Sequence, residues 1–216
     1  MAAHVEGKQL HFGENYVQEL VEKAQALPKD IRWHFVGALQ SNKGKALAGI
    51  PNLYLLETLD SIKAANVLEK ALAAREEKRP EPLRVYIQIN TSGEEAKSGI
   101  TPLLDEGSAS KDHPLLELTR HILTSCPHIR FSGLMTIGAA QNSQTADAEK
   151  VQSREDIIKA NPDFEKLITS RRMLVQALRK DEQVNKAVSD SSSTDASITS
   201  YYQEKLLSGD DETGGL

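Results

Sequence analysis

Four side chains that could contact a ligand lie at or near the ends of predicted strands. Asn15 follows the first strand, His34 lies in the second, Asn90 ends the fourth and Met135 lies in the fifth. Carboxamide and imidazole groups can hold a polar ligand, and histidine can also transfer protons near neutral pH. Asn15 and Asn90 can instead shape turns. His34 can be a satisfied core histidine, and Met135 can fill a gap in the core.

Two carboxylates and three lysines extend this set. Glu14 and Glu57 each end a predicted strand and could form an acid/base pair, but no spacing fixes their separation. Helix-start or surface roles are favoured for both. Lys43, Lys45 and Lys97 lie near strand ends. We expect them to be solvated and to attract an anion rather than to form an imine.

The elements that position these side chains follow from hydrophobic periodicity. Alternating apolar and polar residues predict strands over 10–14, 31–36, 53–57, 83–90 and 129–138. In the strand from Leu83 to Asn90 the alternation is strict. Residues at helical spacing lie between the strands, and strands that alternate with helices are typical of a parallel α/β sheet or barrel. By its parity in the second strand, His34 is expected to point into such a barrel.

The helix ends carry capping signals. Ser41 or Asn42 is expected to cap a short helix after the second strand, and Asp60 or Ser61 the helix after the third. In the last helix, Asn161 is the expected cap and Pro162 the first residue. The apolar positions of this helix, which include Phe164, Leu167, Leu174 and Leu178, are expected to face inward.

Composition narrows the class of protein. The 216 residues are 39% hydrophobic and 26% charged, which is ordinary for a globular protein. A net charge of -5 provides no basic face for nucleic acid, and Cys126, the single cysteine, excludes an internal disulfide. No apolar run reaches the length of a membrane span, and the first residues lack the pattern of a signal peptide. We therefore expect no membrane contact and a cytosolic location. We expect a partial barrel domain over 1–180 and a polar, flexible tail over 181–216.

Four phrases occur in a fixed order along the chain. They are HFGENYVQE at 11–19, WHFVG at 33–37 with LQSNK at 39–43, INTSGE at 89–94 and GLMTIG at 133–138. Together they resemble the pyridoxal 5'-phosphate (PLP) homeostasis proteins over about residues 1–180. The resemblance implies a (β/α)8 barrel of the alanine-racemase N-terminal type, fold-type III, which binds PLP at the carboxyl ends of its strands. It also implies PLP buffering, or delivery to PLP-dependent apo-enzymes, without catalytic turnover. The expected cofactor-binding residues are Asn15, His34, Asn90 and Met135.

The chain differs from the family pattern at both ends. Relatives carry a Val-Ser-Lys strand with the Schiff-base lysine before the first phrase, whereas only Met1–Gln9 precede it here. The Ser-Met-Gly-Met-Ser, Gly-Ser-Thr and Val-Arg-Gly phrases, which supply the phosphate cradle, are not found. The chain is therefore expected to be truncated at both ends and to lack the lysine for covalent binding. Five strands cannot close an eight-stranded barrel. The complete family fold is expected to be a monomer, and this chain to be marginally stable or to self-associate.

Two other functions fit the same residues. A PLP-dependent amino-acid racemase shares the barrel class, but it needs two acid/base groups, one of them normally the cofactor lysine, and a second β-domain. A degenerate fragment that acts only by protein contact is the other alternative. Exchange of the α-proton of alanine would indicate the racemase, and self-association without PLP uptake would indicate the fragment.

Overall fold

A parallel sheet forms the centre of the molecule. The computed structural model describes residues 7, 9–105, 112–144, 153, 158 and 160–190. Its strands are β1 (His11–Glu14), β2 (Arg32–Phe35), β3 (Leu53–Leu59), β4 (Leu83–Gln88) and β5 (Ile129–Met135). Its helices are α2 (Val17–Ala26), α3 (Gly44–Ala48), α4 (Ile62–Ala73), α5 (Pro114–Ser125), α7 (Pro162–Arg179) and α8 (Glu182–Asp190), with the 3-10 helix η1 (Ala140–Gln144).

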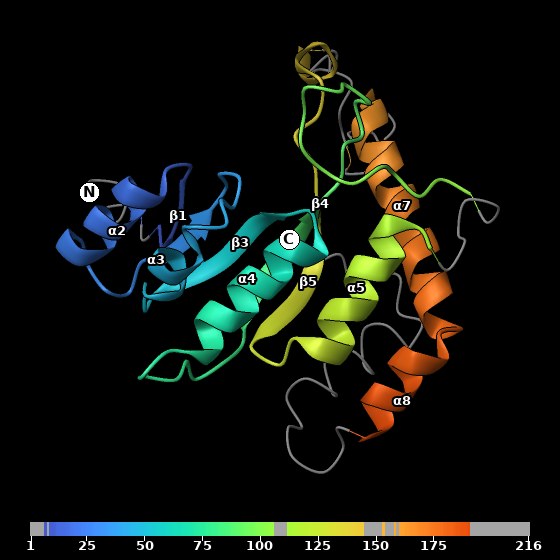
Figure 1. The fold of residues 1–216 in the computed structure, drawn as a ribbon. Coiled ribbons are helices and arrows are strands. Elements are labelled where there is room, and N and C mark those ends of the chain that lie inside the picture. Colours follow the sequence, from blue (N-terminus) through green and yellow to red (C-terminus); the bar gives the residue numbers. More distant parts are fainter. Residues whose placement is uncertain are drawn as a thin grey trace.

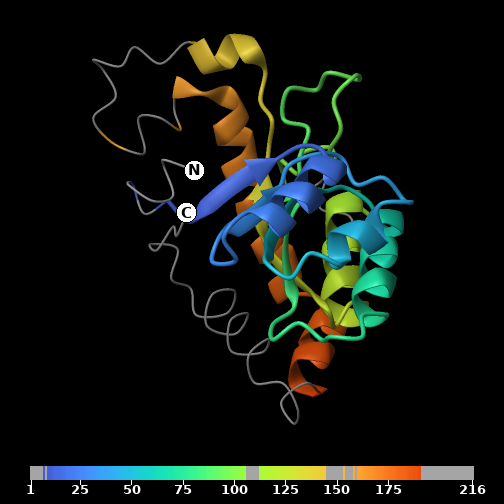
Figure 2. The same cartoon turned by 90° about the vertical axis from the view of Figure 1, so that its left-hand side faces the viewer.

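The strands lie in the sheet in chain order. Each strand pairs in parallel with the next, in the order β1-β2-β3-β4-β5 (Figure 1). Crossovers between neighbouring parallel strands are right-handed, so an unbroken order places the crossover helices on one face of the sheet. Figure 2, which views the molecule from the β1 side, shows α4 and α5 together on that face. This is the arrangement of part of a (β/α)8 barrel, and it confirms the expected fold class.

The core lies between the sheet and these helices. Leu83, Val85 and Ile87 of β4 are completely buried, as the strict alternation of this strand predicted. Burying one such side chain stabilises the fold by about 1.5–3 kcal/mol. The same cluster contains buried residues from the other strands and from the helices, among them Leu20, Trp33, Phe35, Leu47, Leu53, Leu68, Leu118, Ile122 and Leu174.

The bulge in β3 changes which side chains face the concave side of the sheet. Trp33 pairs with Leu53, but the next residue of β2, His34, pairs with Leu55. One extra residue of β3, Tyr54, therefore stands between two successive pairs. Such a bulge reverses the alternation of side chains beyond it. As a result Tyr54 and Glu57, which alternation alone would place on opposite faces, both contact His34.

Two of the three capping predictions are confirmed and one is wrong. Ser61 caps α4 by accepting a hydrogen bond from the Ala64 amide, and Asn161 caps α7. The N-cap of α3 is Lys43, without a side-chain cap, rather than Ser41 or Asn42.

Helix α7 buries a different residue from the one expected in its first turn. Phe164 is 38% exposed, whereas the neighbouring Asp163 is 1% exposed. The first turn meets a polar loop and not the apolar core, so the carboxylate is buried there and the phenyl ring is not.

Helix α8 lies in the region expected to be a flexible tail. It packs beside α5, where Asp181 accepts a hydrogen bond of 2.6 Å from Arg120 Nε and Val184 is buried. Residues 191–216 lie outside the described residues, so the division at residue 180 stays a prediction. Within the described ranges, no helix is long and apolar enough to cross a membrane.

Candidate functional site

The carboxyl ends of all five strands meet at one edge of the sheet, because every strand pair is parallel. Three of the predicted residues lie at this edge in two groups. Asn15 follows β1 and touches the chain after β2, where a Cβ on Gly37 would clash with the Asn15 carbonyl. Asn90 follows β4 beside Met135 of β5, and the Ile89 amide donates to the Met135 carbonyl over 2.8 Å. Strand β3 separates the two groups.

His34 lies deeper in the sheet, in a directed chain of hydrogen bonds. Its Nδ1 is 2.6 Å from Glu57 Oε1, its Nε2 is 2.7 Å from His11 Nδ1, and His11 Nε2 is 3.3 Å from Arg32. An ionised carboxylate can only accept, and a guanidinium can only donate. Along this chain each imidazole therefore donates from Nδ1 and accepts at Nε2. The chain runs from Arg32 through His11 and His34 to Glu57.

Burial and charge keep the outer imidazole of this chain neutral. Burial lowers the pKa of His11, and the neighbouring His34 and Arg32 lower it further. The Tyr54 ring contacts both imidazoles, with the Arg84 guanidinium 4.5 Å from its centre. His34 is thus the satisfied histidine that one interpretation of the sequence allowed, and its ring nitrogens are held by protein groups. Its contact with a ligand stays a prediction.

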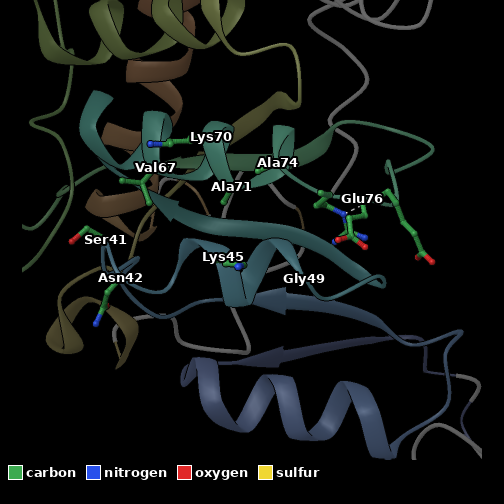
Figure 3. Close-up of a pocket in the computed structure, with 11 residues that line it drawn as sticks. Ser41, Asn42, Lys45, Gly49, Val67, Lys70, Ala71, Ala74 and Glu76 are labelled. Atoms are coloured by element: carbon green, nitrogen blue, oxygen red, sulfur yellow. Dashed lines mark hydrogen bonds between the residues drawn. The ribbon is translucent and has the colours of Figure 1, made fainter.

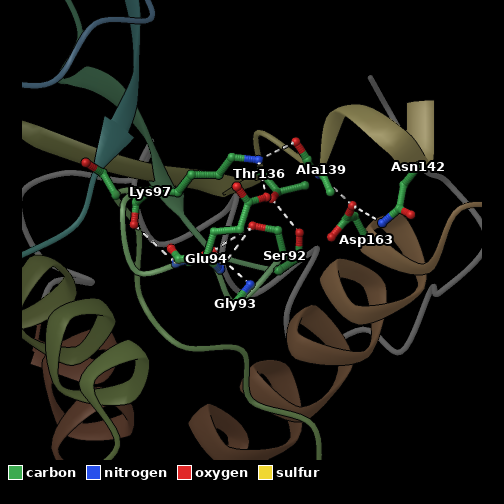
Figure 4. A network of polar contacts seen from close by, with 12 residues as sticks. Ser92, Gly93, Glu94, Lys97, Thr136, Ala139, Asn142 and Asp163 are labelled. Atoms are coloured by element: carbon green, nitrogen blue, oxygen red, sulfur yellow. Dashed lines mark hydrogen bonds and ion pairs between the residues drawn. The ribbon is translucent and has the colours of Figure 1, made fainter. Parts of the chain in front are cut away.

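The side chain of Asn90 organises the loop that follows β4. Its Nδ2 donates to the carbonyls of Glu94 and Lys97, and its Oδ1 accepts from the Gly93 amide and the Ser92 hydroxyl (Figure 4). A carboxamide has two N–H donors and two acceptor lone pairs, so these four bonds use its full capacity. Asn90 therefore shapes the rim of the site, by which we mean the carboxyl ends of the strands and the loops that follow them. Direct contact of Asn90 with a ligand would cost one of these bonds.

Further contacts attach this loop to β5 and α7. The hydroxyls of Thr91 and Thr136 are 2.8 Å apart, and Lys166 Nζ donates to the Thr91 carbonyl over 2.7 Å. Lys97 Nζ donates to the Gly138 carbonyl over 3.1 Å and pairs with Glu94. Figure 4 shows Lys97, Thr136 and Asp163 in one continuous polar network. Lys97 and Lys166 are therefore both engaged by protein oxygens.

Carboxylates lie at the starts of two of the helices at this edge, α2 and α7, whereas α3 and α4 have no acidic residue in the first turn. Burial opposes ionisation of Glu14, but hydrogen bonds from Lys23 and the Asn15 amide lower the pKa of its carboxyl group. Asp163 occupies the first turn of α7. A carboxylate at a helix N-terminus takes the place that a phosphate would bind. Glu14 and Glu57 pair with different partners, Lys23 and His34, and the structure shows no bond between the two carboxylates that would make an acid/base pair.

These residues fit part of a PLP site. Asn15 and Met135 offer a polar and an apolar side chain at the rim. Among the described residues, Lys97 and Lys166 are already bonded to protein oxygens, and the starts of α2 and α7 carry the carboxylates of Glu14 and Asp163. Asn15 and Met135 suit contacts with the cofactor ring, and we assign no described residue to its aldehyde or its phosphate. No group of three or more His, Cys, Asp or Glu side chains in the described ranges is suited to hold a metal.

Two surface grooves lie elsewhere, on either side of the short helix α3. One, of about 690 Å³, lies between α3 and α4 and is lined by Lys45, Val67 and Lys70 among others (Figure 3). The other, of about 720 Å³, lies between α2 and α3. They form because α3 is much shorter than its neighbours. None of the four predicted site residues lines either groove.

Sequence reasoning missed Gly37, Asp163 and Lys166. Gly37 ends the family phrase WHFVG, directly after a predicted strand. A glycine at this place was the signal that another backbone segment passes close by. Asp163 and Lys166 follow Asn161 and Pro162 and have the composition of an ordinary helix start. Nothing local distinguishes them from solvated residues.

The parallel sheet, together with the polar side chains at the carboxyl ends of its strands, defines a parallel α/β protein of the barrel type. No family model matches the chain. The pyridoxal phosphate homeostasis protein of Schizosaccharomyces pombe is 42% identical over 170 residues, which cover 79% of this chain and 60% of the relative. The mouse protein of the same name is 41% identical over 174 residues, 77% of this chain and 54% of the relative. The chain belongs to the pyridoxal phosphate homeostasis protein family.

One solved structure supports the fold. The crystal structure of an unknown protein from Bifidobacterium adolescentis has a TM-score of 0.56 and 26% identity to this chain, and the match covers 81% of this chain and 63% of that chain. The chain spans between about half and two thirds of the length of the relatives that it matches.

Proposed function

We propose that this chain takes part in PLP homeostasis as a non-catalytic protein that binds PLP without a covalent bond. The observation that carries the proposal is the placement of the family phrases. Each of the four includes the carboxyl end of a strand or the residues after it, and all these ends lie at one edge of a single parallel sheet. Ligands of barrel proteins bind at this edge.

The proposal assigns different tasks to the predicted residues. Asn15 and Met135 contact the cofactor ring from the two ends of the rim. Asn90 holds the loop beside Met135, and His34 keeps the inner face ordered through Glu57 and His11. Delivery of PLP to apo-enzymes and a cytosolic location belong to the same proposal.

Equilibrium dialysis of the purified chain against PLP tests the binding. We expect saturable binding that Asn15→Ala and Met135→Ala each weaken by about fivefold, which corresponds to roughly 1 kcal/mol. Asn66→Ala is the matched control, because Asn66 lies on the exposed side of α4 and, within the described residues, its side chain bonds to His121, away from the rim. No saturation up to millimolar PLP would overturn the proposal.

Two further measurements separate the alternatives. Borohydride reduction followed by intact-mass measurement should leave the mass of the washed protein unchanged, and an added pyridoxyl mass on a lysine would overturn the non-covalent assignment. Incubation with PLP and alanine in deuterium oxide should produce no protein-dependent exchange of the α-proton. Exchange that scales with protein concentration would indicate a racemase instead.

A further inference from the structure

Asp163 is a buried carboxylate that connects α7 to the segment after β5. It is 1% exposed, and its Oδ2 accepts hydrogen bonds from the Ala139 amide at 2.9 Å and from Asn142 Nδ2 at 2.7 Å. The Asn161 side chain accepts from the Asp163 amide, so the backbone of this residue is fixed as well. An isolated carboxylate is costly to bury, and these bonds offset that cost.

The segment passes too close to Asp163 to tolerate a side chain at residue 138. A Cβ on Gly138 would lie 2.8 Å from Asp163 Oδ2 and 3.1 Å from its Cβ. Real Cβ atoms do not approach other atoms so closely, and the glycine is therefore required by the contact. Gly138 closes the family phrase that contains Met135 and Thr136.

The electrostatics favour the ionised form of this acceptor. Burial alone would raise the pKa of Asp163, but the hydrogen bonds from Asn142 and the Ala139 amide, with the nearby Thr91 hydroxyl and Lys166, lower it overall. Asp163 Oδ1 is buried and has no hydrogen-bond partner within normal distance. The binding of the segment thus depends on the other oxygen, Oδ2.

The segment held by Asp163 is the one that positions the rim. Gly138 accepts from Lys97 and Thr136 bonds to Thr91, so the 136–139 segment joins the loop after β4 to the end of β5. A shift of this segment would move Met135 and the Thr91 loop together.

We propose that Asp163 is a positioning residue of the PLP site, which sets the place of the 135–139 segment through the Ala139 amide and Asn142 without touching the ligand. The proposal rests on the proposed function. The segment is held by the hydrogen bonds that Oδ2 accepts. In Asp163→Asn the amide oxygen can still accept these bonds, whereas Asp163→Ala has no acceptor at this place.

The test combines hydrogen exchange with PLP dialysis. In Asp163→Ala the protection of the Ala139 amide should fall about tenfold, the value of one lost hydrogen bond, and PLP affinity should fall about fivefold. Asp163→Asn should stay within about twofold of the wild type in both measurements. Gly138→Ala should reproduce the losses of Asp163→Ala from the opposite side of the contact, and the two changes together should cost less than their sum.

Asp181→Ala is the matched control. Asp181 is also a mostly buried carboxylate at a helix start, but it bonds to Arg120 and lies away from the rim. Its loss should lower stability and leave PLP affinity within about twofold. The proposal is overturned if Asp163→Ala leaves Ala139 protected, or if it weakens PLP binding no more than Asp181→Ala does. Absence of PLP binding by the wild type overturns the proposed function, and the exchange measurement then still decides whether Asp163 positions the segment.

Discussion

His34 donates a hydrogen bond from Nδ1 to the carboxylate of Glu57 over 2.6 Å, across neighbouring strands of the sheet. The two side chains are about equally shielded, with 19% and 20% of their surfaces exposed. The bond fixes the tautomer of His34 and leaves its Nε2 to accept from His11. One pair on the concave face thus orders three side chains from three strands.

Replacement of His34 should destabilise the fold. His34→Ala removes the hydrogen-bond partner of Glu57 Oε1 and of His11 Nδ1 in a half-buried place, and we expect a loss of about 1–3 kcal/mol in the free energy of unfolding. Urea denaturation measures it. His121→Ala is the control, because within the described residues the His121 side chain bonds to Asn66 at an exposed position on α4, and it should change stability by less than about 0.5 kcal/mol. Equal effects of the two changes would contradict the role assigned to His34.

Stability should fall as the pH drops below 6.5. The pKa of His11 is lowered from 6.5 by burial and by His34 and Arg32, so the unfolded chain binds a proton more readily than the folded one. The stability from neutral His11 is therefore complete above pH 6.5 and is lost as the pH falls toward the lower folded pKa. His113, whose pKa burial also lowers, contributes in the same direction.

Urea denaturation at a series of pH values between 5 and 7.5 measures this dependence. His11→Gln should flatten the slope without abolishing it, because His113 still titrates. An unchanged slope in His11→Gln would show that His11 titrates alike in both states.

Gly37→Ala should separate the ends of β1 and β2. The new Cβ would clash with the Asn15 carbonyl and lie 2.9 Å from its carbonyl carbon, so the backbone must move. We expect a loss of about 1–3 kcal/mol, measured by urea denaturation. Gly13→Ala is the matched control for this change. Its new Cβ would lie 3.6 Å from the Val36 side chain, which is an ordinary van der Waals contact. A Gly37→Ala protein as stable as Gly13→Ala would contradict the close approach.

Asn90→Ala should loosen the loop after β4 while the sheet stays intact. Four side-chain hydrogen bonds are lost, and the amides of residues 93–98 should exchange at least about tenfold faster. Amides inside β4 should keep their protection. Hydrogen exchange followed by mass spectrometry measures both segments. Unchanged exchange in the loop would mean that its backbone is held by other contacts, such as the Lys97 bond to Gly138.

The amino-acid sequence by itself determined the family, the five strands and the helices up to α7, but not α8. Period-two alternation and helical spacing are local properties, so the five strands could be placed from residues such as Leu83, Val85 and Ile87. The caps at Ser61 and Asn161 were predictable for the same reason, because a cap lies next to the helix that it begins.

Tertiary structure decided which polar side chains meet. The bulge at Tyr54 turns Glu57 toward His34, and alternation along the sequence points the other way. Asp163 is buried and Phe164 exposed because a distant segment, 24 residues earlier in the chain, places the Ala139 amide over the first turn of α7. Hydrogen-bond partners depend on distances in space between residues far apart in the chain, and local periodicity carries no record of those distances.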